Sequence, residues 1–181
     1  IRHEIIPPLN KQGIRKDTMS ATLLEKGNQT LIAFGKHKVP LIGYCEPTLI
    51  SLSDQHCEVM IPLNNKTQNH VNSLYFGTMS IGADITGGFL AMMIGEQSNH
   101  TIELLFKDFK ADFIKRAMAD THFHCHDGQL IQKMIQETVQ TKKRVNKTIS
   151  ITATTPNVTG NEVIATFELT LSLKAKTEPE N

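Results

Sequence analysis

Residues 69–84, NHVNSLYFGTMSIGAD, combine an amide, a glycine and a carboxylate in an order that suits chemistry at a carbonyl group. Asn69 lies in a polar loop, Gly77 lies at the start of an apolar stretch, and Asp84 follows two helical turns later. The first N–H groups of a helix lack intrahelical partners and carry partial positive charge, so they can stabilise an oxyanion. A carboxylate in an apolar setting can act as a base or nucleophile. The segment therefore indicates a site for attack on a carbonyl carbon.

Each of these residues also has a structural interpretation. Asp84 could accept hydrogen bonds within its own helix, although a buried unpaired Asp is rare and favours a site. Asn69 suits a turn or a helix N-cap equally well. Tyr75 and Phe76 suit a core or a pocket wall, and Gly77 suits a close approach of the backbone.

A second group of polar residues is HFHCH, residues 122–126. His122, His124 and His126 alternate on one face of a predicted strand, which raises the question of a metal site. No carboxylate at ligand spacing completes a tetrahedral set, so the sequence favours a polar strand face and no metal. Cys125 points to the other face and is expected to fill the core.

Composition limits the classes of protein to consider. The chain has 181 residues, a formal net charge of +1 and 39% hydrophobic residues, which indicates one folded domain. The balanced charge argues against nucleic-acid binding. Three cysteines without a C-x-x-C spacing, and no visible signal peptide, favour a reducing compartment and a cytoplasmic location.

The apolar run at residues 74–95 is long enough to span a bilayer. A central Asp84 would cost about 2.5 to 3.5 kcal/mol in a membrane, and several glycines interrupt the run. We therefore predict a helix buried inside a domain and no membrane span, with a small membrane protein as the alternative.

The remaining elements must surround that helix. Periodicity predicts helices at 18–35, 72–94 and 127–143, with Gly27 as a break and Asp127 as an N-cap. Strands are predicted in the segments 48–61, 101–126, 145–153 and 166–173, with a hairpin turn at 159–161. An all-round apolar helix needs cover on most sides, which a strongly curved antiparallel sheet would give.

The segment 69–84 resembles the active-site segment of hotdog-fold acyl-CoA thioesterases of the phenylacetyl-CoA and 4-hydroxybenzoyl-CoA type. That pattern is N-x-x-G-x-x-H-G-G, six residues and an acid. The matches are Asn69, Gly77 and Asp84, and the replacements are Asn72, Tyr75 and Phe76. From about 38 to 174 the chain resembles a bacterial branch of this superfamily, with a V-P-x-x-G-like connector at 39–43 and an N-H-x-x-S/T loop at 69–73.

This resemblance implies an α+β hotdog fold, in which a curved antiparallel sheet wraps a long central helix, with an extra N-terminal helix. It implies hydrolysis of an acyl-CoA or acyl-carrier thioester by a homodimer or tetramer, with CoA entering only as part of the substrate and no cofactor. The carbonyl would face the N–H of Phe76 or Gly77. Asp84 of the partner subunit would activate water or attack the carbonyl directly. Asn69 would orient the water or the carboxylate, and the Tyr75 hydroxyl would replace the usual His. The acyl chain would lie between the helices of the two subunits.

Further residues are candidates for substrate contact. They are Asn72, Ser73, Arg116, Lys143 and Arg144, the cations being placed to meet phosphates. The expected organisation is an N-terminal arm and helix at 1–37, the hotdog domain at 38–175 and a polar tail at 176–181. The altered His and Gly positions leave a non-catalytic acyl- or lipid-binding module as an alternative. A hotdog dehydratase using His70 is a further one.

Overall fold

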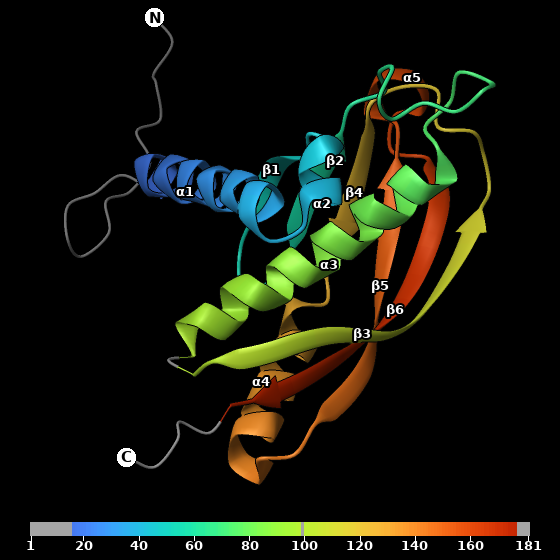
Figure 1. Ribbon diagram of the computed structural model, residues 1–181. Coiled ribbons are helices and arrows are strands. Elements are labelled where there is room, and N and C mark those ends of the chain that lie inside the picture. Colours follow the sequence, from blue (N-terminus) through green and yellow to red (C-terminus); the bar gives the residue numbers. More distant parts are fainter. Residues whose placement is uncertain (1–15, 99, 177–181) are drawn as a thin grey trace, which may run out of the picture.

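The structure, a computed structural model, describes residues 16–98 and 100–176. Two helices precede the first strands, and the later helices lie between strands in the sequence (Figure 1). The helices are α1 (Lys16–His37), α2 (Pro40–Tyr44), α3 (Phe76–Gln97), α4 (Gly128–Thr141) and α5 (Pro156–Thr159). The strands are β1 (Thr48–Leu52), β2 (Cys57–Ile61), β3 (Ile102–Phe113), β4 (Thr121–Cys125), β5 (Val145–Thr154) and β6 (Val163–Ala175).

The strands form a single antiparallel sheet in the order β1-β2-β4-β5-β6-β3. Helix α3 lies across this sheet and contacts five of its strands, from β2 to β6 (Figure 1). Helices α1 and α2 pack together next to β1, and α4 packs against β5, β6 and α3. The predicted α+β architecture, an antiparallel sheet around a long helix with an extra N-terminal helix, is confirmed.

Helix α3 is buried over most of its circumference, as its all-round apolar sequence predicts. It is long and apolar enough to cross a membrane by length and composition, but its neighbours here are the sheet and α4, as for a core helix. Two glycines allow the helix to approach the sheet. A Cβ atom at Gly82 would overlap the Phe123 ring, and one at Gly87 would overlap the Ile149 side chain.

The contact at Gly82 gives a first prediction. Because the Phe123 ring is fully buried and its Cε2 would overlap the new Cβ, we expect Gly82→Ala to lower the free energy of unfolding by roughly 1–3 kcal/mol. Gly95→Ala in the same helix is the control, since its Cβ would lie 3.4 Å from Ile102 Cγ1. Urea unfolding of both variants checks this, and equal stabilities would contradict it.

Strand β3 forms one edge of the sheet and carries a β-bulge between Phe106 and Asp108. The side chains that oppose the buried row of β6 are Ile102, Leu104 and Phe106 before the bulge and Phe109, Ala111 and Phe113 after it. The extra residue, Lys107, therefore keeps apolar side chains on the helix-facing side along the whole strand. Phe109 and Phe113 are nevertheless 44% and 47% exposed, so nothing in the described chain covers them fully.

Helix α1 is attached to the sheet through one amide side chain. Asn28 Oδ1 accepts a hydrogen bond from Leu49 N (2.8 Å), and Asn28 Nδ2 donates to Leu49 O (2.9 Å). Gly27 lies against the same residue, where a Cβ would be 2.5 Å from Leu49 Cδ2. The helix runs unbroken through Gly27, so the predicted break is wrong. The glycine serves a close helix–strand contact.

A predicted turn and a predicted cap also differ from the structure. Residues 159–161 were expected to form a simple hairpin turn, but the short helix α5 precedes Gly160, whose φ is +60°. A proline at the first helical position favours this helix. Asp127 does lie at the N-cap of α4, but its Oδ2 accepts a hydrogen bond from Ser150 N (2.7 Å) and gives no side-chain cap. Residues 1–15 of the predicted N-terminal arm and residues 177–181 of the predicted tail lie outside the described residues.

Candidate active site

The N-terminus of α3 is held by two backbone hydrogen bonds from the residues that lead into it. Leu74 N donates to Ala117 O (2.8 Å), and Tyr75 N donates to Thr67 O (2.8 Å). Thr67 is fully buried, and its hydroxyl donates to Pro62 O (2.6 Å). Thr67 therefore fixes the position of the helix start, a role that sequence reasoning missed because a loop threonine carries no distinguishing pattern.

The first amides of α3 face outward from the helix end. The first intrahelical hydrogen bond runs from Met79 N to Tyr75 O (2.9 Å). The amides of Phe76, Gly77 and Thr78 precede it, and such amides have no acceptor within their own helix. With the helix dipole, they form a positive end suited to a developing oxyanion.

Aromatic rings surround these amides. Tyr75 and Phe76 are 46% and 60% exposed, and their rings meet edge to face at 4.8 Å. Phe76 also meets Phe113 at 6.4 Å. The Tyr75 ring lies over Gly77, where a Cβ would be 2.5 Å from Tyr75 Cε1. The glycine therefore leaves space for this ring beside the helix end.

The loop before α3 uses its polar side chains internally. Asn69 Oδ1 accepts hydrogen bonds from Val71 N (3.0 Å) and Ser73 N (3.1 Å), and Asn69 Nδ2 donates to Ser73 Oγ (2.9 Å). Ser73 is buried beneath the loop. Asn72, at φ +58°, is exposed at the loop tip. In this arrangement Asn69 and Ser73 shape the loop, and Asn72 faces solvent.

Asp84 lies in the middle of α3 on its less buried side. Among the described residues, no hydrogen bond reaches its carboxylate. The Ser80 hydroxyl donates instead to Phe76 O (3.0 Å) and the Thr86 hydroxyl to Gly82 O (2.6 Å). Burial without a compensating partner raises the pKa of Asp84 to about 6. The carboxyl group can therefore exchange a proton close to neutral pH.

Asp84 opens into an apolar cavity of about 360 Å³, which we call the Asp84 cavity. Its walls come from α1, α2, the link between them, α3 and β3. The lining residues are Phe34, Val39, Ile42, Asp84, Ile85, Gly88, Phe89, Met92, Ile102, Leu104, Leu105 and Phe106. Gly88, one turn after Asp84, leaves room for the Phe106 ring, whose Cζ would lie 3.4 Å from a Cβ there.

A second cavity of about 370 Å³ adjoins the start of α3, and we call it the N-terminal cavity. Its lining residues are Asn69, Ser73, Leu74, Phe76, Met79, Phe113, Ile114, Lys115, Arg116 and Ala117. The structure thus brings together Asn69, Ser73, Phe76 and Arg116. It does not bring Asp84 to them, because Asp84 lies seven residues beyond Gly77, about 11 Å along the helix axis.

The cationic candidates lie at two ends of the sheet. Lys115 N donates to Ile164 O (3.0 Å), which places Arg116 near the start of β6. Arg144 pairs with Glu103 and donates to Ser172 O (3.2 Å), near the end of β6. Eight residues of strand separate these anchors, roughly 27 Å. Lys143 and Arg144 therefore cannot share a site with Arg116 within one chain.

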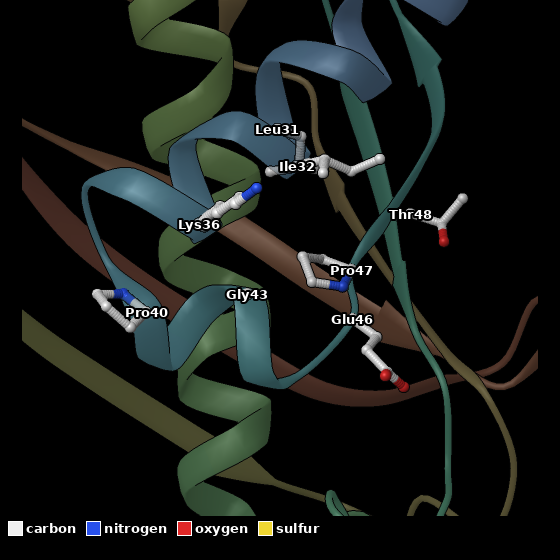
Figure 2. Close-up of a pocket in the computed structure, with 9 residues that line it drawn as sticks. Leu31, Ile32, Lys36, Pro40, Gly43, Glu46, Pro47 and Thr48 are labelled. Atoms are coloured by element: carbon white, nitrogen blue, oxygen red, sulfur yellow. The ribbon is translucent and has the colours of Figure 1, made fainter.

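A third hollow, of about 550 Å³, lies on the outer side of α1 and α2 (Figure 2). Leu31, Ile32 and Pro47 line it, together with Lys36 and Glu46. Figure 2 shows the Glu46 carboxylate directed away from Lys36, and Glu46 pairs with Lys66. The hollow holds no carboxylate in an apolar setting, so it is not the catalytic candidate.

The histidines occupy the outer face of the sheet. His122 Nδ1 lies 2.7 Å from Glu58 Oε1, and His124 Nε2 lies 3.0 Å from Thr154 Oγ1. Burial lowers the pKa of His124. Within residues 16–98 and 100–176, no group of three or more His, Cys, Asp or Glu residues is arranged to hold a metal ion. Cys125 is buried on the opposite face, as predicted.

Three known structures share this arrangement of elements. A thioesterase from Haemophilus influenzae has a TM-score of 0.62 at 13% identity, covering 87% of this chain and 94% of its own. A thioesterase from Pseudomonas aeruginosa, solved as a mutant, has a TM-score of 0.61 at 10% identity, covering 82% and 94%. A protein of unknown function from Chlorobaculum tepidum has a TM-score of 0.70 at 11% identity, covering 87% and 97%.

Sequence comparison gives two further results. No curated protein sequence matches the chain. The profile described as "Domain of unknown function (DUF4442)" matches residues 27–172. The chain has the hotdog fold that residues 69–84 suggested, and it belongs to the DUF4442 family.

Proposed function

We propose that this protein hydrolyses an acyl thioester, with acyl-CoA as the substrate class. The observation that carries the proposal is Asp84, a carboxylate that opens into an apolar cavity and whose burial raises its pKa to about 6. Such a group can accept a proton from water near neutral pH. The names of the Haemophilus and Pseudomonas neighbours, which share the fold, support the same reaction class.

The reacting groups come from two copies of the chain in this proposal. A carbonyl polarised at Gly77 is too far from Asp84 of the same helix for that carboxylate to reach it, at about 11 Å. In a homodimer, Asp84 of the partner subunit would face the start of α3. The half-exposed Phe109 and Phe113, on a strand at the edge of the sheet, support a second copy at this side of the sheet.

The chemical steps follow from these groups. Asp84 takes a proton from water as the water oxygen bonds to the thioester carbon, and the carbonyl oxygen becomes an oxyanion at the amide of Phe76 or Gly77. Collapse of this intermediate breaks the carbon–sulfur bond. The leaving thiolate takes the proton from Asp84, which restores the carboxylate. The Tyr75 hydroxyl would donate a hydrogen bond to the substrate, and Asn69 would hold the loop in place.

Thiol release by the purified protein tests the proposal. The substrates are short, medium, long and aromatic acyl-CoA thioesters, and free thiol is measured with a chromogenic disulfide. Release that scales with protein concentration and exceeds spontaneous hydrolysis supports the proposal. No release with any of the thioesters would overturn it.

The pH dependence of turnover gives a second prediction. Because Asp84 must be ionised to accept a proton, we expect kcat/KM to rise with pH and level off above a midpoint near 6. An unperturbed Asp would give a midpoint near 4. Thiol release between pH 4.5 and 8, measured with a pH-independent thiol probe, locates the midpoint. A flat profile over this range would contradict the role of Asp84.

A non-catalytic acyl-binding module is the second candidate. The observation in its favour is the Tyr75 ring, which lies over Gly77 at the helix end where an oxyanion would bind. Such a module would bind acyl-CoA without releasing thiol. The dehydratase alternative has less support, since His70 is exposed in the loop before α3 and does not line the Asp84 cavity.

A further inference from the structure

We propose that the Asp84 cavity accepts an unsubstituted aliphatic acyl chain of medium length and that Met92 sets the length it admits. This inference rests on the thioesterase proposal and adds the substrate class to it. The proposed aliphatic acyl chain differs from the aromatic acyl groups of the thioesterases whose active-site segment residues 69–84 resemble. The argument uses the direction, the lining and the volume of the cavity.

The cavity extends from Asp84 toward the end of α3. Phe106 packs at Gly88, one turn beyond Asp84, and Ile102 packs near Gly95, where a Cβ would be 3.4 Å from Ile102 Cγ1. Met92 lies between these two contacts, eight residues and about 12 Å from Asp84 along the helix. A chain attached to a carbonyl at Asp84 would therefore run between α3 and β3 and end at Met92.

The helices before the sheet complete the enclosure. Phe34 from α1, Val39 from the link and Ile42 from α2 add apolar side chains on the remaining side. Gly35 of α1 and Gly43 of α2 allow these two helices to pack closely, since a Cβ at Gly35 would lie 2.7 Å from Gly43 Cα. The N-terminal helices thus have a role in this inference, as a wall of the acyl pocket.

The lining selects against polar groups on the chain. Of the described residues around the cavity, Asp84 alone has a polar side chain. A phenolic hydroxyl placed deep in the cavity would lose its hydrogen bonds to water without a side-chain partner in exchange. An unsubstituted chain has no hydrogen bonds to water to lose, and burying each of its methylenes raises the binding affinity by about fourfold.

The volume limits the length. At about 30 Å³ for each water-sized group, 360 Å³ holds no more than roughly a dozen such groups. Because part of this space is open to solvent, we expect the best fit for chains of about six to ten carbons. A chain of sixteen carbons would have to displace Met92 or leave its end in water.

Calorimetric titration with non-hydrolysable acyl-CoA thioethers tests the inference without requiring turnover. The ligands carry chains of 4, 8, 12 and 16 carbons or a 4-hydroxyphenyl group. We expect the 8-carbon ligand to bind most tightly to the wild-type protein. Met92→Ala removes three heavy atoms and should shift the optimum toward 12 carbons, with the 12-carbon ligand gaining at least tenfold in affinity. Met92→Leu, which nearly keeps the volume, should retain the wild-type preference.

Met93→Ala is the matched control, because Met93 is the next residue on the same helix, is also half-buried, and does not line the cavity. Its preference should equal that of the wild type. An unchanged preference in a folded Met92→Ala protein, tightest binding of the 4-hydroxyphenyl ligand, or no binding of any thioether would each overturn the inference. A shifted preference without thiol release from acyl-CoA would uphold it and defeat the hydrolysis proposal. Thiol release with an unshifted preference would uphold the hydrolysis proposal and overturn the inference about Met92.

Discussion

Asp84→Asn is expected to lower kcat by roughly a hundredfold to ten-thousandfold, because an amide cannot accept the proton of the attacking water. The substitution keeps the size of the side chain, so the cavity and the packing of α3 should persist. Thiol release measures the effect, and size-exclusion chromatography checks the assembly. Glu96→Gln is the control, since Glu96 is an exposed acid on the same helix. Activity that survives Asp84→Asn would exclude the carboxylate as the base.

The same substitution should raise stability. In the folded protein burial raises the pKa of Asp84 from 3.8 to about 6, so the native state binds the proton more tightly than the unfolded chain. Native stability therefore falls as the pH rises from about 4 to about 6. Above that range the ionised carboxylate costs up to about 3 kcal/mol, which Asp84→Asn removes. The two proteins should converge in stability below pH 4, and equal stabilities at pH 7 would contradict this account.

Mixing two inactive variants should restore activity if each active site uses groups from two chains. Phe76→Pro removes the first amide of α3. Proline is favoured at this helix position, and Tyr75 has the extended ψ of 138° that a residue before proline requires. We expect Phe76→Pro to lower kcat by roughly a hundredfold to a thousandfold. Phe76→Ala, which keeps the amide, separates this effect from loss of the ring.

An equal mixture of Phe76→Pro and Asp84→Asn, unfolded and refolded together, gives the second large effect. Half of the dimers would then contain one chain of each variant. In each of these dimers, one of the two sites would combine an intact Phe76 amide from one chain with an intact Asp84 from the other. Activity should rise from near zero to about one quarter of the wild-type value. Each variant refolded alone is the control. A mixture no more active than its components would show that the two groups do not meet across a dimer interface.

Hydropathy was sufficient to predict a long buried helix covered by a curved sheet and the position of Asp84 within that helix, whereas the hotdog fold followed from the resemblance of residues 69–84 to a known family. An all-round apolar helix requires a sheet around it, and one acid within that helix stands out. The positions of Arg116 and Arg144 could not be predicted in the same way. Arg116 follows β3 and Arg144 follows α4 in the sequence. They lie at opposite ends of the sheet because their segments contact opposite ends of β6. The role of Thr67 could not be predicted either, because Thr67 holds the start of α3 through its backbone carbonyl, which accepts a hydrogen bond from Tyr75 N.

The bulge at Lys107 divides β3 into two functional halves. The inner side chains before it, including Leu104 and Phe106, line the Asp84 cavity, whereas Phe113 beyond it lines the N-terminal cavity. A single inserted residue therefore separates the part of the strand that lines the Asp84 cavity from the part that lies beside the start of α3. Within our proposal, acyl preference can therefore be engineered in the first half of the strand without changing the residues that line the N-terminal cavity.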